Sequence, residues 1–101
     1  MNIKIIGAGS AGNHICFAFR KIRAKVTLTD ASNESLLRTK NIIYKKRYGK
    51  WDSSIKLIKE QNDFSKYDLI IISTPPKTNN ALIKLVIFAF SFEYLELIRF
   101  A

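Results

Sequence analysis

The sequence predicts an α/β fold: a parallel β-sheet with helices on both faces, corresponding to the first half of a doubly wound fold. The β-branched residues Ile3, Ile5 and Ile6 and the apolar run at residues 69–72 are typical of buried parallel strands. Between them, segments with helical spacing alternate with further strand-like segments, and this alternation is typical of parallel sheets. A glycine-rich turn, Gly7–Gly12, joins the first strand-like segment to the first helical segment.

The first helix and the second strand follow from local patterns. Apolar residues at positions i, i+4 and i+7 predict a helix over residues 13–22, namely Ile15, Phe19 and Ile22. Cations gather in its last turn, where the helix dipole favours them. Residues 25–29 then predict a second strand that ends at Asp30.

The remaining elements are less sharply marked. Ser32 is the expected N-cap of a helix that runs toward Asn41 or beyond. Residues 55–58 are too short to assign as helix or strand by periodicity alone. We favour a strand, because the alternation of elements needs a third parallel strand before Leu69. A last helix is expected from Thr78 onward.

Composition bounds the class of protein. The chain has 101 residues, of which 48% are hydrophobic, enough for the core of one small domain. One cysteine, Cys16, excludes a disulfide framework and predicts a core thiol, and no metal site is expected. No secretory signal pattern is visible at Met1. The most apolar run, residues 85–92, is far shorter than the ~18 residues of a membrane span, so we expect a cytoplasmic protein.

The glycine turn is the candidate ligand-binding motif, because it fits the spacing G-x-G-x-x-G of dinucleotide-binding Rossmann domains. Gly7 would permit the tight turn, Gly9 would let the backbone approach a pyrophosphate, and Gly12 would let the helix pack closely on the strand. The pyrophosphate would then meet free N–H groups at the helix N-terminus. Spacing alone is a weak signal, but the flanking strand and helix strengthen it.

The acid at the end of the second strand points to the kind of dinucleotide. A carboxylate at Asp30 would accept hydrogen bonds from the adenosine ribose and repel a 2′-phosphate. No arginine follows Asp30 directly. The sequence therefore predicts NAD as the cofactor in preference to NADP.

The loop Thr74-Pro75-Pro76 ends the fourth strand, beside the first strand in such a sheet. Ligands of doubly wound folds bind beyond the carboxyl ends of the strands near this point. The two prolines would form a rigid wall against the dinucleotide, or they simply end the strand. The sequence leaves both interpretations open.

Taken together, these motifs resemble the N-terminal domain of the glucose-fructose oxidoreductase / inositol dehydrogenase (Gfo/Idh/MocA) family over about residues 2–86. That resemblance implies an NAD(P)-dependent dehydrogenase of sugars or polyols, with a separate C-terminal substrate domain. It also implies a role for each matching residue. Gly7, Gly9, Ser10, Ala11 and Gly12 would hold the pyrophosphate, Asp30 the ribose, and Thr74, Pro75 and Pro76 the nicotinamide side.

Departures from the family pattern are equally clear. Asn79 stands where members usually have a histidine, and the Glu-Lys-Pro that carries the catalytic lysine is missing, since Glu93 is followed by Tyr94. We therefore expect residues 1–86 to be a partial cofactor domain and residues 87–101 to be an atypical apolar tail, helical in conformation. The substrate domain would be absent, as in a fragment or a frameshifted reading frame, and the chain alone would carry no catalytic residue.

Two other functions remain open at this stage. The chain has a net charge of +9, and the segment 44–51 interleaves cations with aromatic rings, as nucleic-acid patches do. Charge runs more often form solvated faces, so nucleic acid is not our expected partner. The other alternative is a non-catalytic nucleotide-sensing or protein-interaction module, in which the apolar tail docks a missing domain or a second copy. His14, alone on its helix, is interpreted as a surface or packing residue.

Overall fold

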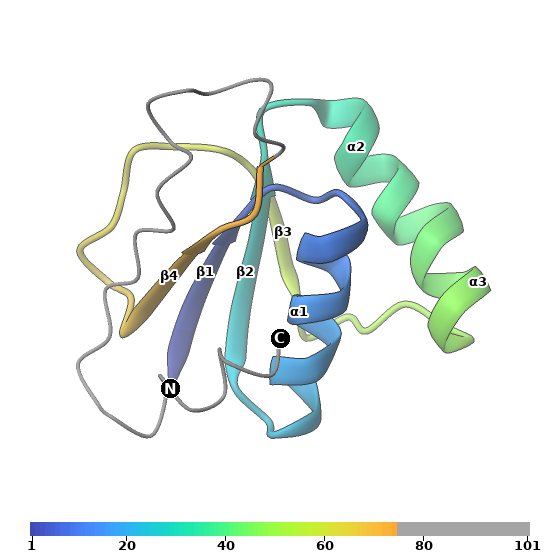
Figure 1. Ribbon diagram of the computed structural model, residues 1–101, viewed down its shortest axis with the longest axis horizontal. Coiled ribbons are helices and arrows are strands. Elements are labelled where there is room, and N and C mark those ends of the chain that lie inside the picture. The colour runs from blue at the N-terminus through green and yellow to red at the C-terminus, as the bar shows by residue number, and fades with distance from the viewer. Residues whose placement is uncertain (75–101) are drawn as a thin grey trace.

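The computed structural model describes residues 1–74, which form a four-stranded parallel sheet with helices packed against it (Figure 1). In chain order the elements are β1 (Asn2–Ile6), α1 (Ser10–Lys21), β2 (Lys25–Asp30), α2 (Asn33–Arg38), a π-helical segment (Thr39–Ile43), α3 (Tyr44–Tyr48), β3 (Lys56–Lys59) and β4 (Leu69–Ile72).

The strands lie in the order β3-β2-β1-β4, and all three pairs are parallel. This is the strand order of a Rossmann sheet, in which the chain moves outward from β1 and then crosses back to the other side of β1. The predicted fold class and the strand at residues 55–58, observed one residue later, are thereby confirmed. The topological switch point lies between β1 and β4.

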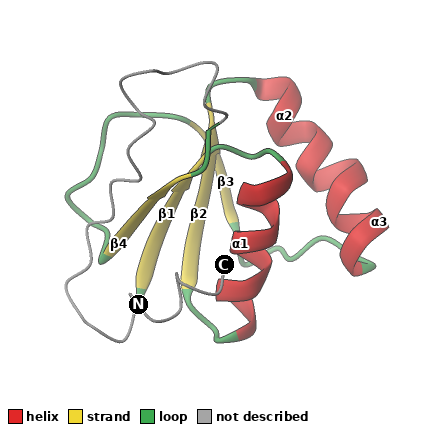
Figure 2. Ribbon diagram, viewed as in Figure 1, coloured by secondary structure: helices red, strands yellow, loops and turns green. Residues whose placement is uncertain are grey.

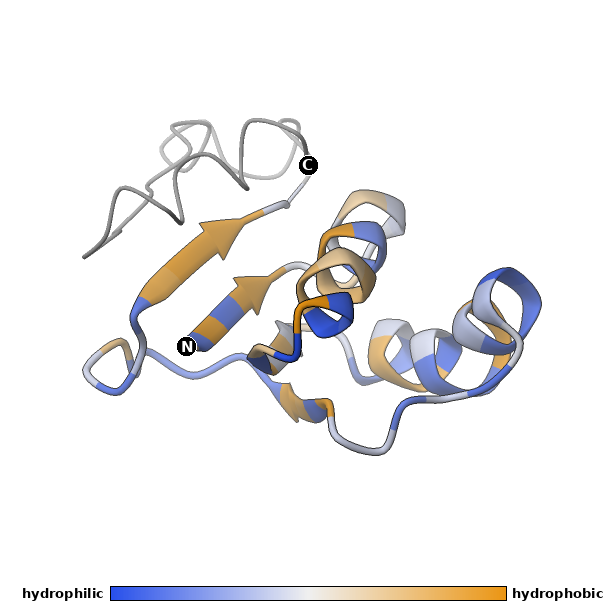
Figure 3. Ribbon diagram, turned by 90° about the horizontal axis from the view of Figure 1, so that it is seen from below, coloured by the Kyte–Doolittle hydropathy of each residue, from blue (hydrophilic) through white to orange (hydrophobic). Residues whose placement is uncertain are grey.

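The helices lie on one face of the sheet, and β4 is hydrophobic along its whole length (Figures 2 and 3). In the register of the strands, Ile5 lies between Leu28 on β2 and Ile71 on β4, and all three are buried. Cys16 and Phe19 of α1 belong to the same buried cluster. Side chains alternate between the two faces along each strand. The residues directly before and after Ile5, Leu28 and Ile71 in sequence therefore point to the opposite face of the sheet.

The second helical region continues past Asn41, which the predicted range allows. Ser32 caps it as predicted, since its side chain accepts a hydrogen bond from the Ser35 N–H. The helical backbone then continues through α2, the π-helical segment and α3 up to Gly49. Gly49 has φ +89°, a conformation that favours glycine and ends the helix. The first half of the basic and aromatic segment 44–51 is therefore helical.

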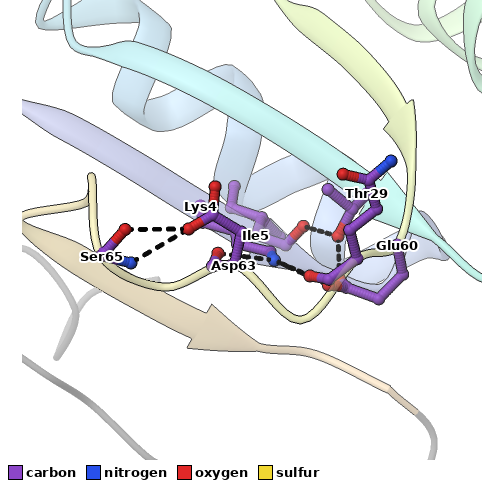
Figure 4. A network of polar contacts seen from close by, with 7 residues as sticks. Lys4, Ile5, Thr29, Glu60, Asp63 and Ser65 are labelled. Carbon is purple, nitrogen blue, oxygen red and sulfur yellow. Dashed lines mark hydrogen bonds and ion pairs between the residues drawn. The ribbon is translucent and has the colours of Figure 1, made fainter.

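The face of the sheet opposite the helices is crossed by the connection from β3 to β4, residues 60–68 (Figure 4). Lys4 of β1 is 2% exposed, and its Nζ lies 2.7 Å from the Glu60 carboxylate. The same Nζ donates hydrogen bonds to the carbonyls of Gln61 (2.5 Å) and Asp63 (3.1 Å). Thr29 hydrogen-bonds the other oxygen of Glu60. A buried cation thus attaches the connection to the sheet.

All helices within residues 1–74 lie on one face of the sheet. The helix that the sequence predicts from Thr78 onward, together with the apolar tail 87–101, lies outside the described residues. None of the helices in the described part of the chain is long and apolar enough to cross a bilayer.

Replacing Glu60 by Gln would keep the side chain's size but remove the charge that neutralises Lys4. A buried ammonium that loses its counter-charge is costly, so we expect the free energy of unfolding to fall by about 2–3 kcal/mol. Urea unfolding followed by circular dichroism measures this. Glu34→Gln is the matched control: Glu34 is exposed in the first turn of α2 and should cost less than about 1 kcal/mol. Equal losses for the two variants would contradict the expectation.

The Cys16 thiol should be chemically inert in the folded protein. Burial raises its pKa to about 11, despite a hydrogen bond with Tyr44 that acts in the opposite direction. The reactive thiolate is therefore scarce near neutral pH, and we expect alkylation by iodoacetamide to be on the order of a hundredfold slower than in denaturant. Mass spectrometry of timed samples gives both rates. Similar rates in the two conditions would show that the thiol is not buried in solution.

Candidate functional site

The glycine turn after β1 lies at the switch point of the sheet. Gly7 has φ +112°, which favours glycine, and its N–H donates to the Thr29 carbonyl of β2 (2.8 Å). On the other side, Ser73 follows β4 and donates its N–H to the Ile6 carbonyl (2.8 Å) and its hydroxyl to the Gly7 carbonyl (2.9 Å). The turn is therefore held between the carboxyl ends of both strands that flank β1.

Gly12 and Gly9 serve different purposes in the geometry. A Cβ at Gly12 would lie 1.8 Å from the Gly7 carbonyl oxygen, so the first turn of α1 packs directly on the glycine turn. A Cβ at Gly9 would meet nothing within 4 Å. Gly9, Ser10 and Ala11 are exposed, whereas Gly7 and Gly12 are buried. The outer part of the turn is thus open to a ligand, and the inner part is packed.

The carbonyl groups of the turn are bound from inside the protein by Asn13 and Thr39. Asn13 is fully buried, and its Nδ2 donates to the carbonyls of Ala8 (3.0 Å) and Gly9 (2.8 Å) and to the Thr39 hydroxyl (3.2 Å). Thr39 in turn donates to the Ala8 carbonyl (3.3 Å). Sequence reasoning missed both residues, although a polar residue directly after the third glycine is a usable signal.

The N–H groups of the first turn of α1 have no such partners. Within residues 1–74, no acceptor binds the N–H of Ser10, Ala11 or Gly12, as expected for the free donors at a helix start. Gly9 at the N-cap offers no side-chain cap, and no acidic side chain lies in this turn. Free donors and the positive end of the helix dipole together favour an anion here.

Asp30 lies at the end of β2, beside the glycine turn, as the sequence predicts. One carboxylate oxygen accepts the Ala8 N–H (2.8 Å), and the other accepts the Ser32 N–H (2.8 Å). Each oxygen keeps a second lone pair for a further donor. The side chain is half-buried, so it joins the turn to the start of α2 and still reaches the surface.

The predicted residues after β4 are described only in part. Ile72 is in register with Ile6, so Ser73 and Thr74 reach the same edge of the sheet as the glycine turn. Thr74 is half-buried there. Pro75 and Pro76 lie outside the described residues. Whether they form a wall against the dinucleotide or only end the strand therefore stays open.

The aromatic side chains of residues 44–51 pack on α1. Tyr48 stacks on Phe17 with ring centroids 3.8 Å apart, and Tyr44 meets Tyr48 and Trp51 edge to face. A hollow of about 350 Å³ opens beside these rings and is bordered by the Arg20–Asp52 ion pair (2.8 Å). Partial burial acts to raise the pKa of Asp52, but hydrogen bonds from Arg20 and Ser54 outweigh it and lower that pKa.

One cation of this segment reaches the glycine turn. Arg47 of α3 donates from Nη2 to the Ser10 hydroxyl (2.8 Å) and from Nη1 to the Ser10 carbonyl (3.4 Å). The charge pattern of the sequence placed Arg47 in a solvated run and offered no signal for this contact. His14 is exposed, and its Nδ1 lies 3.4 Å from the Tyr48 hydroxyl.

Comparison with known proteins supports the fold. No family model matches the chain, and no curated protein matches its sequence. Among solved structures, it is similar to a 3-hydroxyacyl-CoA dehydrogenase from Archaeoglobus fulgidus, with a TM-score of 0.64 and 22% identity. The match covers 98% of this chain and 30% of that protein. The fold is of the Rossmann type. At this identity the likeness extends to the fold and not to the activity.

Substitution of Gly12 by Ala should destabilise the protein strongly. Alanine usually stabilises a helix by about 1 kcal/mol relative to glycine. Here its Cβ would collide with the Gly7 carbonyl, so we expect a loss of at least about 3 kcal/mol in the free energy of unfolding. Gly9→Ala is the matched control in the same turn and should stay within about 1 kcal/mol of wild type. Thermal and urea unfolding measure both, and a stable Gly12→Ala protein would contradict the packing described above.

Proposed function

We propose that this chain binds a nicotinamide dinucleotide at the carboxyl edge of its sheet, and binds NAD in preference to NADP. The observation that carries the proposal is the first turn of α1: three N–H groups at the switch point that have no acceptor within residues 1–74, next to an exposed glycine turn. Gly7, Gly9, Ser10, Ala11 and Gly12 would line the pyrophosphate. Thr74, Pro75 and Pro76 would face the nicotinamide.

Asp30 supports the choice of NAD. Its oxygens accept backbone N–H groups, but each retains a lone pair, so the ribose hydroxyls of adenosine would have acceptors beside the glycine turn. A 2′-phosphate at the same place would lie against this carboxylate and be repelled. The next residues, Ala31 and Ser32, carry no cation to offset that repulsion.

The finer proposal is that the domain belongs to an oxidoreductase of the Gfo/Idh/MocA type, which transfers hydride between NAD(P) and a sugar or polyol. The sequence motifs support it, from the glycine turn to the Thr-Pro-Pro segment after the fourth strand. The chain spans 30% of the length of the dehydrogenase that it resembles in fold. Each of the residues named above would bind the cofactor, and none of them would act as the acid or base of hydride transfer.

The test is a titration of the purified chain with NADH and with NADPH, followed by nucleotide fluorescence. We expect wild type to bind NADH more tightly than NADPH. Asp30→Asn should weaken NADH binding by about tenfold, because the charged acceptor of the ribose hydroxyls is lost.

Asp68→Asn is the matched control for that variant. Asp68 also accepts a backbone N–H, that of Asn2 (2.7 Å), but it lies at the amino ends of the strands. Its replacement should leave NADH affinity unchanged. Absence of NADH binding by the folded wild-type chain, or tighter binding of NADPH, would overturn the proposal.

A further inference from the structure

Arg47 lies at the first turn of α1, although it belongs to α3. It binds Ser10, the first residue of α1, through two of its nitrogens. Both side chains are exposed, so the contact borders the open part of the glycine turn. A guanidinium has five N–H donors, and these two contacts leave three of them unused.

The charge of Arg47 is not neutralised by the part of the chain that the structure describes. The ion pairs within residues 1–74 join Lys4 to Glu60 and Arg20 to Asp52. Neither includes Arg47. A full positive charge therefore lies beside the free N–H groups of α1, where the helix dipole already favours an anion.

Ser10 adds a donor to this group. Its Oγ accepts a hydrogen bond from Arg47, so its own hydroxyl proton is free to donate elsewhere. The backbone N–H groups, the hydroxyl proton and the remaining guanidinium N–H groups are all donors. The oxygens of a phosphate are acceptors only, and they match such a set.

Packing of the neighbouring rings sets the backbone position of Arg47. The neighbouring Tyr48 stacks on Phe17 of α1, and its hydroxyl lies within reach of His14. Tyr44, one turn earlier on α3, is buried. These rings hold α3 along α1, so the guanidinium is kept near the start of α1.

We propose that Arg47 binds the pyrophosphate of the dinucleotide together with Ser10, so that α3 supplies a phosphate-binding cation to the glycine turn. The inference rests on the proposed function and adds to it a residue that the G-x-G-x-x-G spacing does not contain. It also gives the basic segment 44–51 a role with a small phosphorylated ligand.

The experiment compares wild type with Arg47→Gln, Arg47→Lys and the control Lys46→Gln, which removes the same charge from the neighbouring exposed position. NADH is titrated by fluorescence at several salt concentrations, and inorganic pyrophosphate is titrated by phosphorus NMR. Arg47→Gln should weaken NADH binding by about tenfold and make it less sensitive to salt. The NADH affinity of Arg47→Lys should lie between those of wild type and Arg47→Gln, because lysine keeps the positive charge but loses the planar set of guanidinium N–H donors. Lys46→Gln should change affinity by less than about twofold.

A second readout separates ligand binding from a purely structural role. If Arg47 only tied α3 to α1, Arg47→Gln would lower the melting temperature without altering the salt dependence of binding, and adenosine would lose as much affinity as NADH. A lower melting temperature with unchanged salt dependence and equal losses for adenosine and NADH would overturn the inference. Unchanged NADH affinity in Arg47→Gln would also overturn it. Wild type that binds inorganic pyrophosphate through Arg47 but no NADH contradicts the proposed function and supports only the phosphate-binding role of Arg47 and Ser10. Wild type that binds neither contradicts both.

Discussion

The close contact between Gly12 and the Gly7 carbonyl is the constraint on which the site depends. No side chain fits between them, so the first turn of α1 is pressed onto the end of β1. The hydroxyl of Ser73 donates to the same carbonyl and brings the end of β4 to the same point. The end of β1, the start of α1 and the end of β4, which is distant from both in sequence, are thereby fixed at one place. With the inner carbonyls bound by Asn13, the N–H groups of Ser10, Ala11 and Gly12 are left without an acceptor within residues 1–74.

The position of β4, which creates the switch point, depends on the opposite face of the sheet. The connection across that face contains no helix, so it cannot be held by an apolar helical stripe. Lys4 replaces that stripe: its ammonium binds one carboxylate and two carbonyls of the connection. Phe64 and Tyr67 also lie close to the ammonium, at 4.7 and 5.8 Å from their ring centroids. A charge inside the sheet is tolerated because nearly all of its hydrogen bonds are replaced.

Much of this fold could be predicted from local pattern, because its strands and first helix have strong local signals. The apolar runs at β1 and β4, the spaced glycines and the Ser32 cap each act within a few residues. The burial of Lys4 could not be predicted, since its partners lie in a loop without periodicity. The end of the second helical region stayed open in the sequence, because that region is stabilised by rings that pack on Phe17 of α1 and not by its own spacing.

The net charge of +9 illustrates why position matters more than composition for function. Lys4 is buried and paired, Arg20 is paired with Asp52, and Arg47 lies unpaired within residues 1–74 beside free N–H groups. These cations are equivalent in a count of charges, yet their positions differ. Lys4 attaches the β3–β4 connection to the sheet, and Arg20 borders the hollow beside the aromatic rings. Arg47 adds positive charge to the start of α1. From its sequence alone, the basic and aromatic segment 44–51 suggests a nucleic-acid-binding patch. In the folded chain its rings are engaged in packing, and one of its cations, Arg47, binds Ser10 at the start of α1, which is the contact on which the proposed small phosphorylated ligand rests.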